Sequence, residues 1–138
     1  MATIDLQTMR YINLLDRISG VKTSRCFNYN NTITFAVPKN FVSKAIGLNA
    51  SNIREMQENF GKKVRIVEEA QSLKDAERFI RSIVAPVSFK SLEIKDNCLI
   101  INAGAQSKAA LIGRNKRRLE ELRRISIDNL GVDDLKIF

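Results

Sequence analysis

The chain has 138 residues, 44% of them hydrophobic and 28% charged, which suits one domain or two small ones and excludes a disordered composition. Its formal charge of +8 and pI near 9.8 favour a polyanionic partner, nucleic acid before an anionic membrane surface. Histidine, the commonest general base and zinc nitrogen ligand, is missing, and no apolar run approaches the roughly 18–20 residues of a membrane span.

The first half of the sequence predicts a helix, a hairpin, two helices that meet at a glycine, and a strand. Apolar spacing marks these elements, and Asn30-Asn31 supplies turn chemistry between the paired strands. In chain order we expect a helix capped by Thr3 and ended by Gly20, with Met9, Ile12, Leu15 and Ile18 on its apolar side; strands over 21–29 and 32–37; a helix from Pro38 to Ile46; a helix over 51–60 capped by Asn49 or Ser51; and a strand over 64–67.

The second half predicts the same series. Ser72 and Asp75 form a capping-box pattern, and Pro86 closes the helix that follows it. The expected elements are that helix, a strand over 87–94 with a bulge between Phe89 and Leu92, a turn over 95–97, a strand over 98–102, a helix over 104–112, a helix carrying Leu119, Leu122 and Ile125, and a strand over 135–138. Expected core positions include Phe35, Phe41, Phe60, Phe79 and Phe89, and both cysteines, Cys26 and Cys98, are expected to be structural thiols.

The order helix, strand, strand, helix, turn, helix, strand therefore occurs twice. We expect two α+β domains, residues 1–69 and 70–138, each a sheet covered by helices. Each half is marginal in size for a core of its own, and the linker candidate Glu68–Gln71 is very short. The two domains are therefore expected to pack as a rigid pair.

Two helix-turn-helix segments, each entered by Ile-Gly, are the main candidates for a site. The first elbow is residues 46–53 and the second elbow is residues 112–119, with Gly113 lying 66 residues after Gly47. The N–H groups and the dipole at the start of a helix favour an anion. A glycine at the turn leaves room for a phosphodiester backbone to approach. KH modules clamp about four nucleotides of a single strand with such a loop, and we expect the bases to lie in an apolar groove beside it.

In element order and motifs the chain resembles the short archaeal NusA-like transcription factors, which consist of two tandem type II KH domains. The resemblance covers essentially the whole chain. It is carried by the Met9-Arg10-Tyr11-Ile12 segment, Cys26, Ala45-Ile46-Gly47, Asn52-Ile53, Ile83-Val84-Ala85-Pro86-Val87 and Leu111-Ile112-Gly113-Arg114-Asn115. It implies an RNA-binding protein without the polymerase-binding and S1 domains of the bacterial factor.

The sequence departs from the family pattern Ile-Gly-x-x-Gly-x-Asn-Ile at both elbows. Ala50 and Lys116 replace the second glycine, and Arg118-Leu119 replaces Asn-Ile in the second elbow. The methyl group of Ala50 fits a helix N-terminus where φ is negative. Lys116 either obstructs the path of the RNA backbone or supplies a phosphate contact.

We therefore expect a non-enzymatic, cytoplasmic protein that binds single-stranded RNA, acts on nascent transcript in termination or elongation, and needs no cofactor. RNA polymerase is left open as a further partner, and neither a membrane nor a small-molecule substrate is expected. The expected RNA-binding residues are Lys44, Gly47, Leu48, Asn49, Ala50, Asn52, Lys108, Gly113, Arg114, Asn115, Lys116, Arg117 and Arg118. Capping is the alternative role for Asn49 and Asn52. The alternative functions are an RNA-binding factor in ribosome assembly or RNA processing, and a protein-interaction adaptor with degenerate KH loops.

Overall fold

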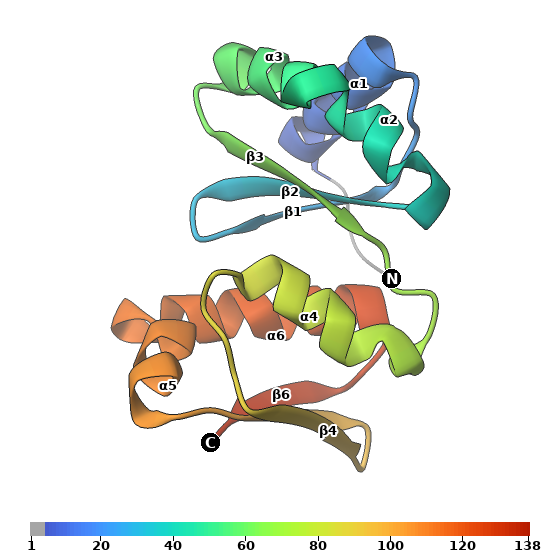
Figure 1. Ribbon diagram of the computed structural model, residues 1–138. Helices are drawn as coiled ribbons and strands as arrows, with labels where there is room; N and C mark the ends of the chain where they lie inside the picture. Colours follow the sequence, from blue (N-terminus) through green and yellow to red (C-terminus); the bar gives the residue numbers. More distant parts are fainter. Residues whose placement is uncertain (1–4) are drawn as a thin grey trace. The chain divides into compact units, whose positions relative to one another are not determined.

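Each half of the chain folds into a three-stranded sheet with helices packed on it, as Figure 1 shows. The computed structural model describes residues 5–138 and divides into two compact units, Met1–Glu69 and Ala70–Phe138. Both units follow the expected order of helix, strand, strand, helix, helix, strand. None of the helices in the described part of the chain has the length and hydropathy to cross a bilayer.

The first unit packs its helices on a sheet of strand order β1-β2-β3. β1 pairs with β2 in antiparallel fashion and β2 with β3 in parallel, so that Phe35 lies opposite Cys26 on one side and Ile66 on the other. Its core joins Phe35 to Leu15 and Met56 from two helices. The elements are α1 (Leu6–Ser19), β1 (Arg25–Tyr29), β2 (Thr32–Val37), η1 (Lys39–Phe41), α2 (Val42–Ile46), η2 (Leu48–Ala50), α3 (Ser51–Phe60) and β3 (Lys63–Glu68).

The second unit repeats this topology with strand order β4-β5-β6, antiparallel and then parallel. Leu111, Leu122 and Leu135 are fully buried and come from the two elbow helices and the last strand. The elements are η3 (Leu73–Asp75), α4 (Ala76–Val84), β4 (Ser91–Lys95), β5 (Cys98–Asn102), α5 (Ala105–Ile112), η4 (Arg114–Lys116), α6 (Arg117–Leu130) and β6 (Asp134–Ile137).

Both hairpins turn through two residues with positive φ. Asn30 and Asn31 join β1 to β2 with φ of 52° and 59°, and Asp96 and Asn97 join β4 to β5 with φ of 52° and 56°. Turns with two left-handed residues match the twist of antiparallel strands, and Asn and Asp adopt this conformation more readily than other residues with a Cβ. The turn predicted at Asn30-Asn31 is confirmed.

The first helix, α1, begins after Asp5 and buries Tyr11 and Leu15. The predicted cap Thr3 lies outside the described residues, and the N-cap of α1 is Asp5, whose carboxylate accepts a 2.7 Å hydrogen bond from the Thr8 amide. That bond lowers the pKa of Asp5. Met9, expected on the apolar side, is 47% exposed, and Tyr11 is buried instead.

Phe41 and the strand over 87–94 were predicted incorrectly. Phe41 is 45% exposed because it lies in the 3₁₀ turn η1, ahead of α2, where the spacing of an α-helix does not apply. β4 begins only at Ser91. The preceding Phe89 is anchored on α4, where the Arg81 guanidinium lies 4.1 Å from its ring centroid and donates to its carbonyl oxygen. The apparent slip in alternation is therefore the start of the strand and not a bulge.

Both cysteines are free and partly buried. Cys26 packs against the core of the first unit, and this burial raises the pKa of its thiol to about 12. The Cys98 thiol lies 3.6 Å from the Leu99 carbonyl oxygen.

Candidate nucleic-acid interface

The two elbows have the same backbone conformation. Gly47 has φ 82° and ψ 167°, and Gly113 has φ 75° and ψ 172°. Two residues further on, Asn49 and Asn115 are left-handed, with φ of 54° and 56°. In each elbow the next residue is left-handed as well, and the second helix follows it directly. The repeat seen in the sequence is therefore a repeat of local structure.

Glycine is required at the first position of each elbow for two reasons. A positive φ combined with an extended ψ is a region that essentially only glycine occupies. A Cβ on Gly47 would also lie 2.8 Å from side-chain atoms of Asn52, and a Cβ on Gly113 would lie 2.6 Å from Cγ of Arg118. The expectation that the missing Cβ leaves room for a phosphodiester is wrong in this respect, because the first turn of the following helix fills that space.

Ala50 and Lys116, which replace the second glycine of the family pattern, are left-handed. Their φ angles are both 59°, so the expectation of a negative φ at Ala50 is wrong. Every other non-glycine residue with positive φ in the described part of the chain is Asn or Asp. Side chains with an ordinary Cβ lose roughly 1–2 kcal/mol in this conformation. Both elbows therefore hold a strained residue at the same place.

In each elbow, two backbone N–H groups near the start of the second helix form hydrogen bonds to carbonyl oxygens of the same elbow. The Ala50 amide donates to the Gly47 carbonyl oxygen at 3.1 Å, and the Lys116 amide donates to that of Gly113 at 3.2 Å. The first residue of each following helix also donates its amide to the carbonyl oxygen three residues earlier, Ser51 to Leu48 and Arg117 to Arg114. The second and third amides of α3 and α6 lie in the first turn, where a helix supplies no acceptor of its own and its dipole favours an anion.

In the first elbow, polar side chains hold the turn together. The Asn52 amide group donates to the Lys44 carbonyl oxygen at 3.0 Å, and the Arg54 guanidinium donates to the Asn49 carbonyl oxygen. The predicted caps Asn49 and Ser51 are wrong, because the N-cap of α3 is Ala50, which has no side-chain cap. Asn52 acts instead between the two helices.

The outer surface of the first elbow carries little charge. Leu48 is 84% exposed at the tip of the turn. The Lys44 side chain extends from α2 to Gly20 at the C-terminus of α1, where a cation is favoured by the helix dipole. The exposure of Leu48 could not be predicted from the sequence, because a leucine one residue after the elbow glycine is equally compatible with a core position.

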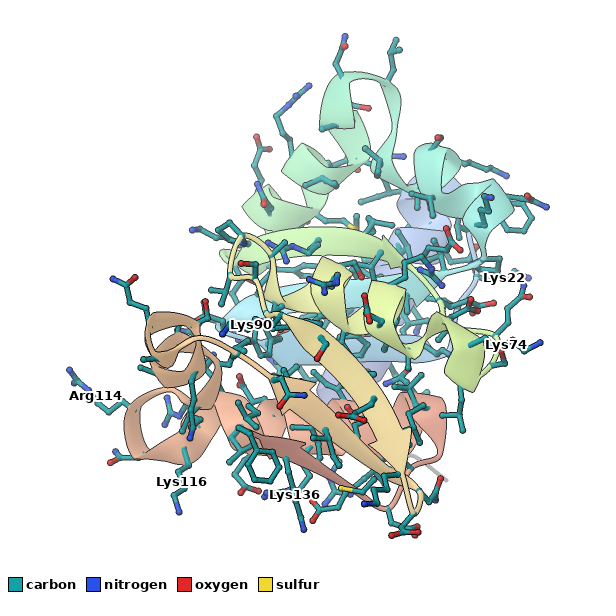
Figure 2. All side chains as sticks on the ribbon, turned by 60° about the horizontal axis from the view of Figure 1, so that its bottom comes forward. Lys22, Lys74, Lys90, Arg114, Lys116 and Lys136 are labelled. Carbon is teal, nitrogen blue, oxygen red and sulfur yellow. The ribbon has the colours of Figure 1, made fainter. Side chains whose placement is uncertain are left out.

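The second elbow exposes a cluster of cations. Arg114, Lys116 and Arg117 are exposed, as is Asn115 between them, and Figure 2 shows Arg114 and Lys116 projecting outward from the turn. The fourth cation, Arg118, differs from them. Its side chain is 14% exposed, packs under Gly113, and forms a 2.8 Å ion pair with Glu121. The structure thus brings three of the four predicted cations to the surface.

Lys108 lies on the first helix of the second elbow. It is exposed on α5, and its backbone amide donates to the Gly104 carbonyl oxygen as part of the first turn. Like Lys44 in the first unit, it lies on the helix that enters the elbow, but it is five residues before the elbow glycine, whereas Lys44 is three residues before it.

Comparison with known proteins agrees with this architecture. Residues 32–82 match the model of the KH domain family, a segment that runs from β2 through the first elbow and β3 into α4. Over 98% of its length the chain is 25% identical to a "Probable transcription termination protein NusA" of Halococcus morrhuae, of which it covers 97%. It is 27% identical to a protein of the same name from Methanocaldococcus jannaschii, over 99% of this chain and 76% of that protein.

A solved structure is similar over the same extent. The protein described as "Crystal structure of APE1850" matches with a TM-score of 0.67 and 26% identity, covering 98% of this chain and all of that one. The two units share the tandem KH order of elements, and the KH match contains one of the two elbows. The chain is therefore similar to archaeal NusA proteins along its whole length and has a tandem KH fold.

Proposed function

We propose that this protein binds single-stranded RNA at its two elbows and acts on nascent transcript during transcription termination or elongation. The main support for the proposal is the elbow, which begins at a glycine and occurs twice with the same backbone conformation. Each copy ends in the amide donors at the start of a helix. KH modules hold about four nucleotides by this kind of loop. The names of the relatives, which are called transcription termination proteins, support the assignment to transcription.

The backbone amides of Asn52 and Ile53 in the first elbow, and of Arg118 and Leu119 in the second, would hold phosphates. In the second elbow, Arg114, Lys116 and Arg117 would add charge-assisted contacts, while Arg118 positions the turn through Glu121. Lys44 and Lys108 would flank the strand on the entering helices. Two such modules on one chain raise the overall affinity through effective concentration, because binding of the second becomes intramolecular.

The proposal explains why cations gather at a helix start. The N-terminus of α6 is the positive end of its dipole, where Arg and Lys side chains are unfavourable. Arg114, Lys116 and Arg117 nevertheless surround it, and within the described residues none of the three makes an ion pair with an acidic side chain. Phosphate at this position would neutralise both the dipole and the side chains.

The test is the salt dependence of RNA binding, measured by fluorescence anisotropy with a labelled 12-nucleotide single strand. We expect binding that weakens as salt rises from about 50 to 200 mM. Replacing Arg114, Lys116 and Arg117 by Gln should reduce the slope of log K against log[salt] by about 2, because each phosphate contact to a single strand contributes about 0.7.

The control removes the same amount of charge elsewhere. Replacing Lys22, Lys74 and Lys95 by Gln leaves both elbows intact and should change the slope by less than about 0.7, one phosphate contact. These three side chains are exposed, and two of them, Lys22 and Lys74, are labelled in Figure 2. Equal slopes for the two triple variants would identify a nonspecific basic surface. No binding at low salt would favour the protein-interaction adaptor.

RNA polymerase is the proposed protein partner. Its support is the name of the relatives, which are called transcription termination proteins. The measurement is copurification of polymerase subunits with the tagged protein from its own cells after nuclease treatment. Copurification with ribosomal particles alone would favour a role in ribosome assembly.

A further inference from the structure

A cleft opens on the first unit between α1 and the end of α3, away from the elbow. Its larger lobe has a volume of about 330 Å³ and is lined by Arg10, Asn13, Leu14, Arg17, Asn59 and Phe60. A smaller lobe of about 160 Å³ shares three of these residues, Arg10, Asn59 and Phe60. The two lobes therefore form one continuous depression along α1.

The charge of this cleft is positive and uncompensated. Arg10 and Arg17 lie two helical turns apart on one side of α1, and both are exposed. Within residues 5–138, neither of the two side chains forms an ion pair or a hydrogen bond. The acidic residues next in sequence on these helices, Asp16 and Glu58, do not line the cleft.

A structural role accounts for only one of the two arginines. Arg17 lies in the last turn of α1, where the helix dipole favours a cation. Arg10 lies in the middle of the same helix and gains nothing from the dipole. By contrast, the arginines Arg81, Arg118 and Arg123 of the second unit are all paired with carboxylates.

The remaining walls suit a nucleobase. Phe60 is partly exposed, and its ring is held edge-on against Tyr11 with centroids 4.6 Å apart. Asn59 donates its amide to the Glu55 carbonyl oxygen, which leaves its side-chain oxygen as an acceptor at the cleft. An aromatic face, amide groups and guanidinium groups are the combination with which proteins hold unstacked bases and their phosphates.

We propose that this cleft is a second contact for single-stranded RNA, in which Arg10 and Arg17 bind phosphates and Phe60 stacks on a base. The inference rests on the proposed RNA-binding function. α3 begins at the first elbow and ends at the cleft, so that a strand held at the elbow continues for about 15 Å along this helix to reach it. The cleft would supply the charge that the first elbow lacks.

The test compares two double variants of the full chain in the anisotropy assay. Replacing Arg10 and Arg17 by Gln should lower the affinity for a 12-nucleotide strand about fivefold or more and reduce the salt slope by about 1.4, two phosphate contacts. Replacing Lys74 and Lys95 by Gln removes the same charge at exposed positions outside the cleft and both elbows, and should leave the affinity and the slope nearly unchanged.

A second measurement does not depend on variants. In NMR titrations of the unmodified protein, a 12-nucleotide strand should shift the amides of residues 10–17 and 59–61 as well as those of the elbows. A tetranucleotide, long enough for one KH loop, should shift the elbow amides alone.

The outcomes separate this proposal from the proposed function. The cleft proposal would be overturned if the cleft variant and the control variant lost equal amounts of binding. It would also be overturned if the longer strand shifted the elbow amides alone. Either result would leave the proposal of RNA binding at the elbows unaffected. If the unmodified protein binds no RNA, both proposals fail together.

Discussion

At the scale of single residues, the left-handed conformation of Ala50 and Lys116 has a measurable cost. Asn49 and Asn115 precede them with nearly the same φ, but Asn tolerates this region, whereas Ala and Lys do not. Natural sequences keep such strain mostly at functional sites. At Lys116 the strained backbone conformation occurs in a residue that also adds a cation to the elbow, which is consistent with selection for a phosphate contact.

We predict that Ala50→Gly and Lys116→Gly each stabilise the fold by about 0.5–1 kcal/mol, because relief of the left-handed strain exceeds the added entropy of glycine in the unfolded chain. Ser51→Gly is the matched control, since its φ is −60° and glycine there should destabilise. Thermal unfolding measures all three. Lys116→Gly should in addition weaken RNA binding; tighter binding would mean that the lysine obstructs the loop.

At the scale of elements, the elbow depends on how closely two helices approach at its glycine. We predict that Gly113→Ala destabilises more than Gly47→Ala. At Gly113 the added Cβ meets Cγ and the backbone nitrogen of Arg118 at 2.6 and 3.1 Å, whereas at Gly47 it meets side-chain atoms alone, the amide group of Asn52 and the Ser51 hydroxyl, at 2.8 Å. Losses of about 2–4 and 1–3 kcal/mol follow from strain and overpacking. Gly104→Ala is the control, with ordinary φ and open space. Alanine is a poorer N-cap than glycine but stiffens the unfolded chain, so the two effects largely offset and the net change should stay below about 1 kcal/mol. Equal losses at both elbows would contradict this account of their packing.

Sequence periodicity predicted the elements because most of them are amphipathic and end at glycine or in a two-residue turn. α3, for example, buries Met56, as its apolar spacing indicates, and ends before Gly61 in the left-handed conformation. Periodicity failed where the chain leaves regular geometry. Phe41 lies in a 3₁₀ turn, and residues 87–90 wrap against α4 before β4 begins.

The candidate site was located by sequence, but its conformation was not. The pattern Ile-Gly identified both turns, since glycine marks positions that other residues cannot occupy. The backbone angle at Ala50 could not be inferred from its residue type, because alanine normally favours negative φ. The pairing of Arg118 with Glu121 and the exposure of Leu48 depend on the angle between two helices, which a linear pattern does not encode.

At the scale of the whole molecule, the positive charge does not depend on pH near neutrality. The excess of +8 comes from 23 Lys and Arg residues against 15 Asp and Glu, and the chain has no histidine. Lys and Arg side chains ordinarily titrate above about pH 10, and Asp and Glu below about pH 5. Of the two thiols, that of Cys26 has its pKa raised to about 12 by burial, so it stays neutral.

We therefore predict that RNA affinity changes less than about twofold between pH 6 and 8 at constant ionic strength, apart from the contribution of the chain's α-amino group. Over the same range of pH, raising the salt from about 50 to 200 mM should weaken binding by an order of magnitude or more, since several phosphate contacts act together. Anisotropy titrations at three pH values and two salt concentrations measure both effects. A change above about fivefold with pH, at fixed salt, would contradict binding through Lys, Arg and backbone amides.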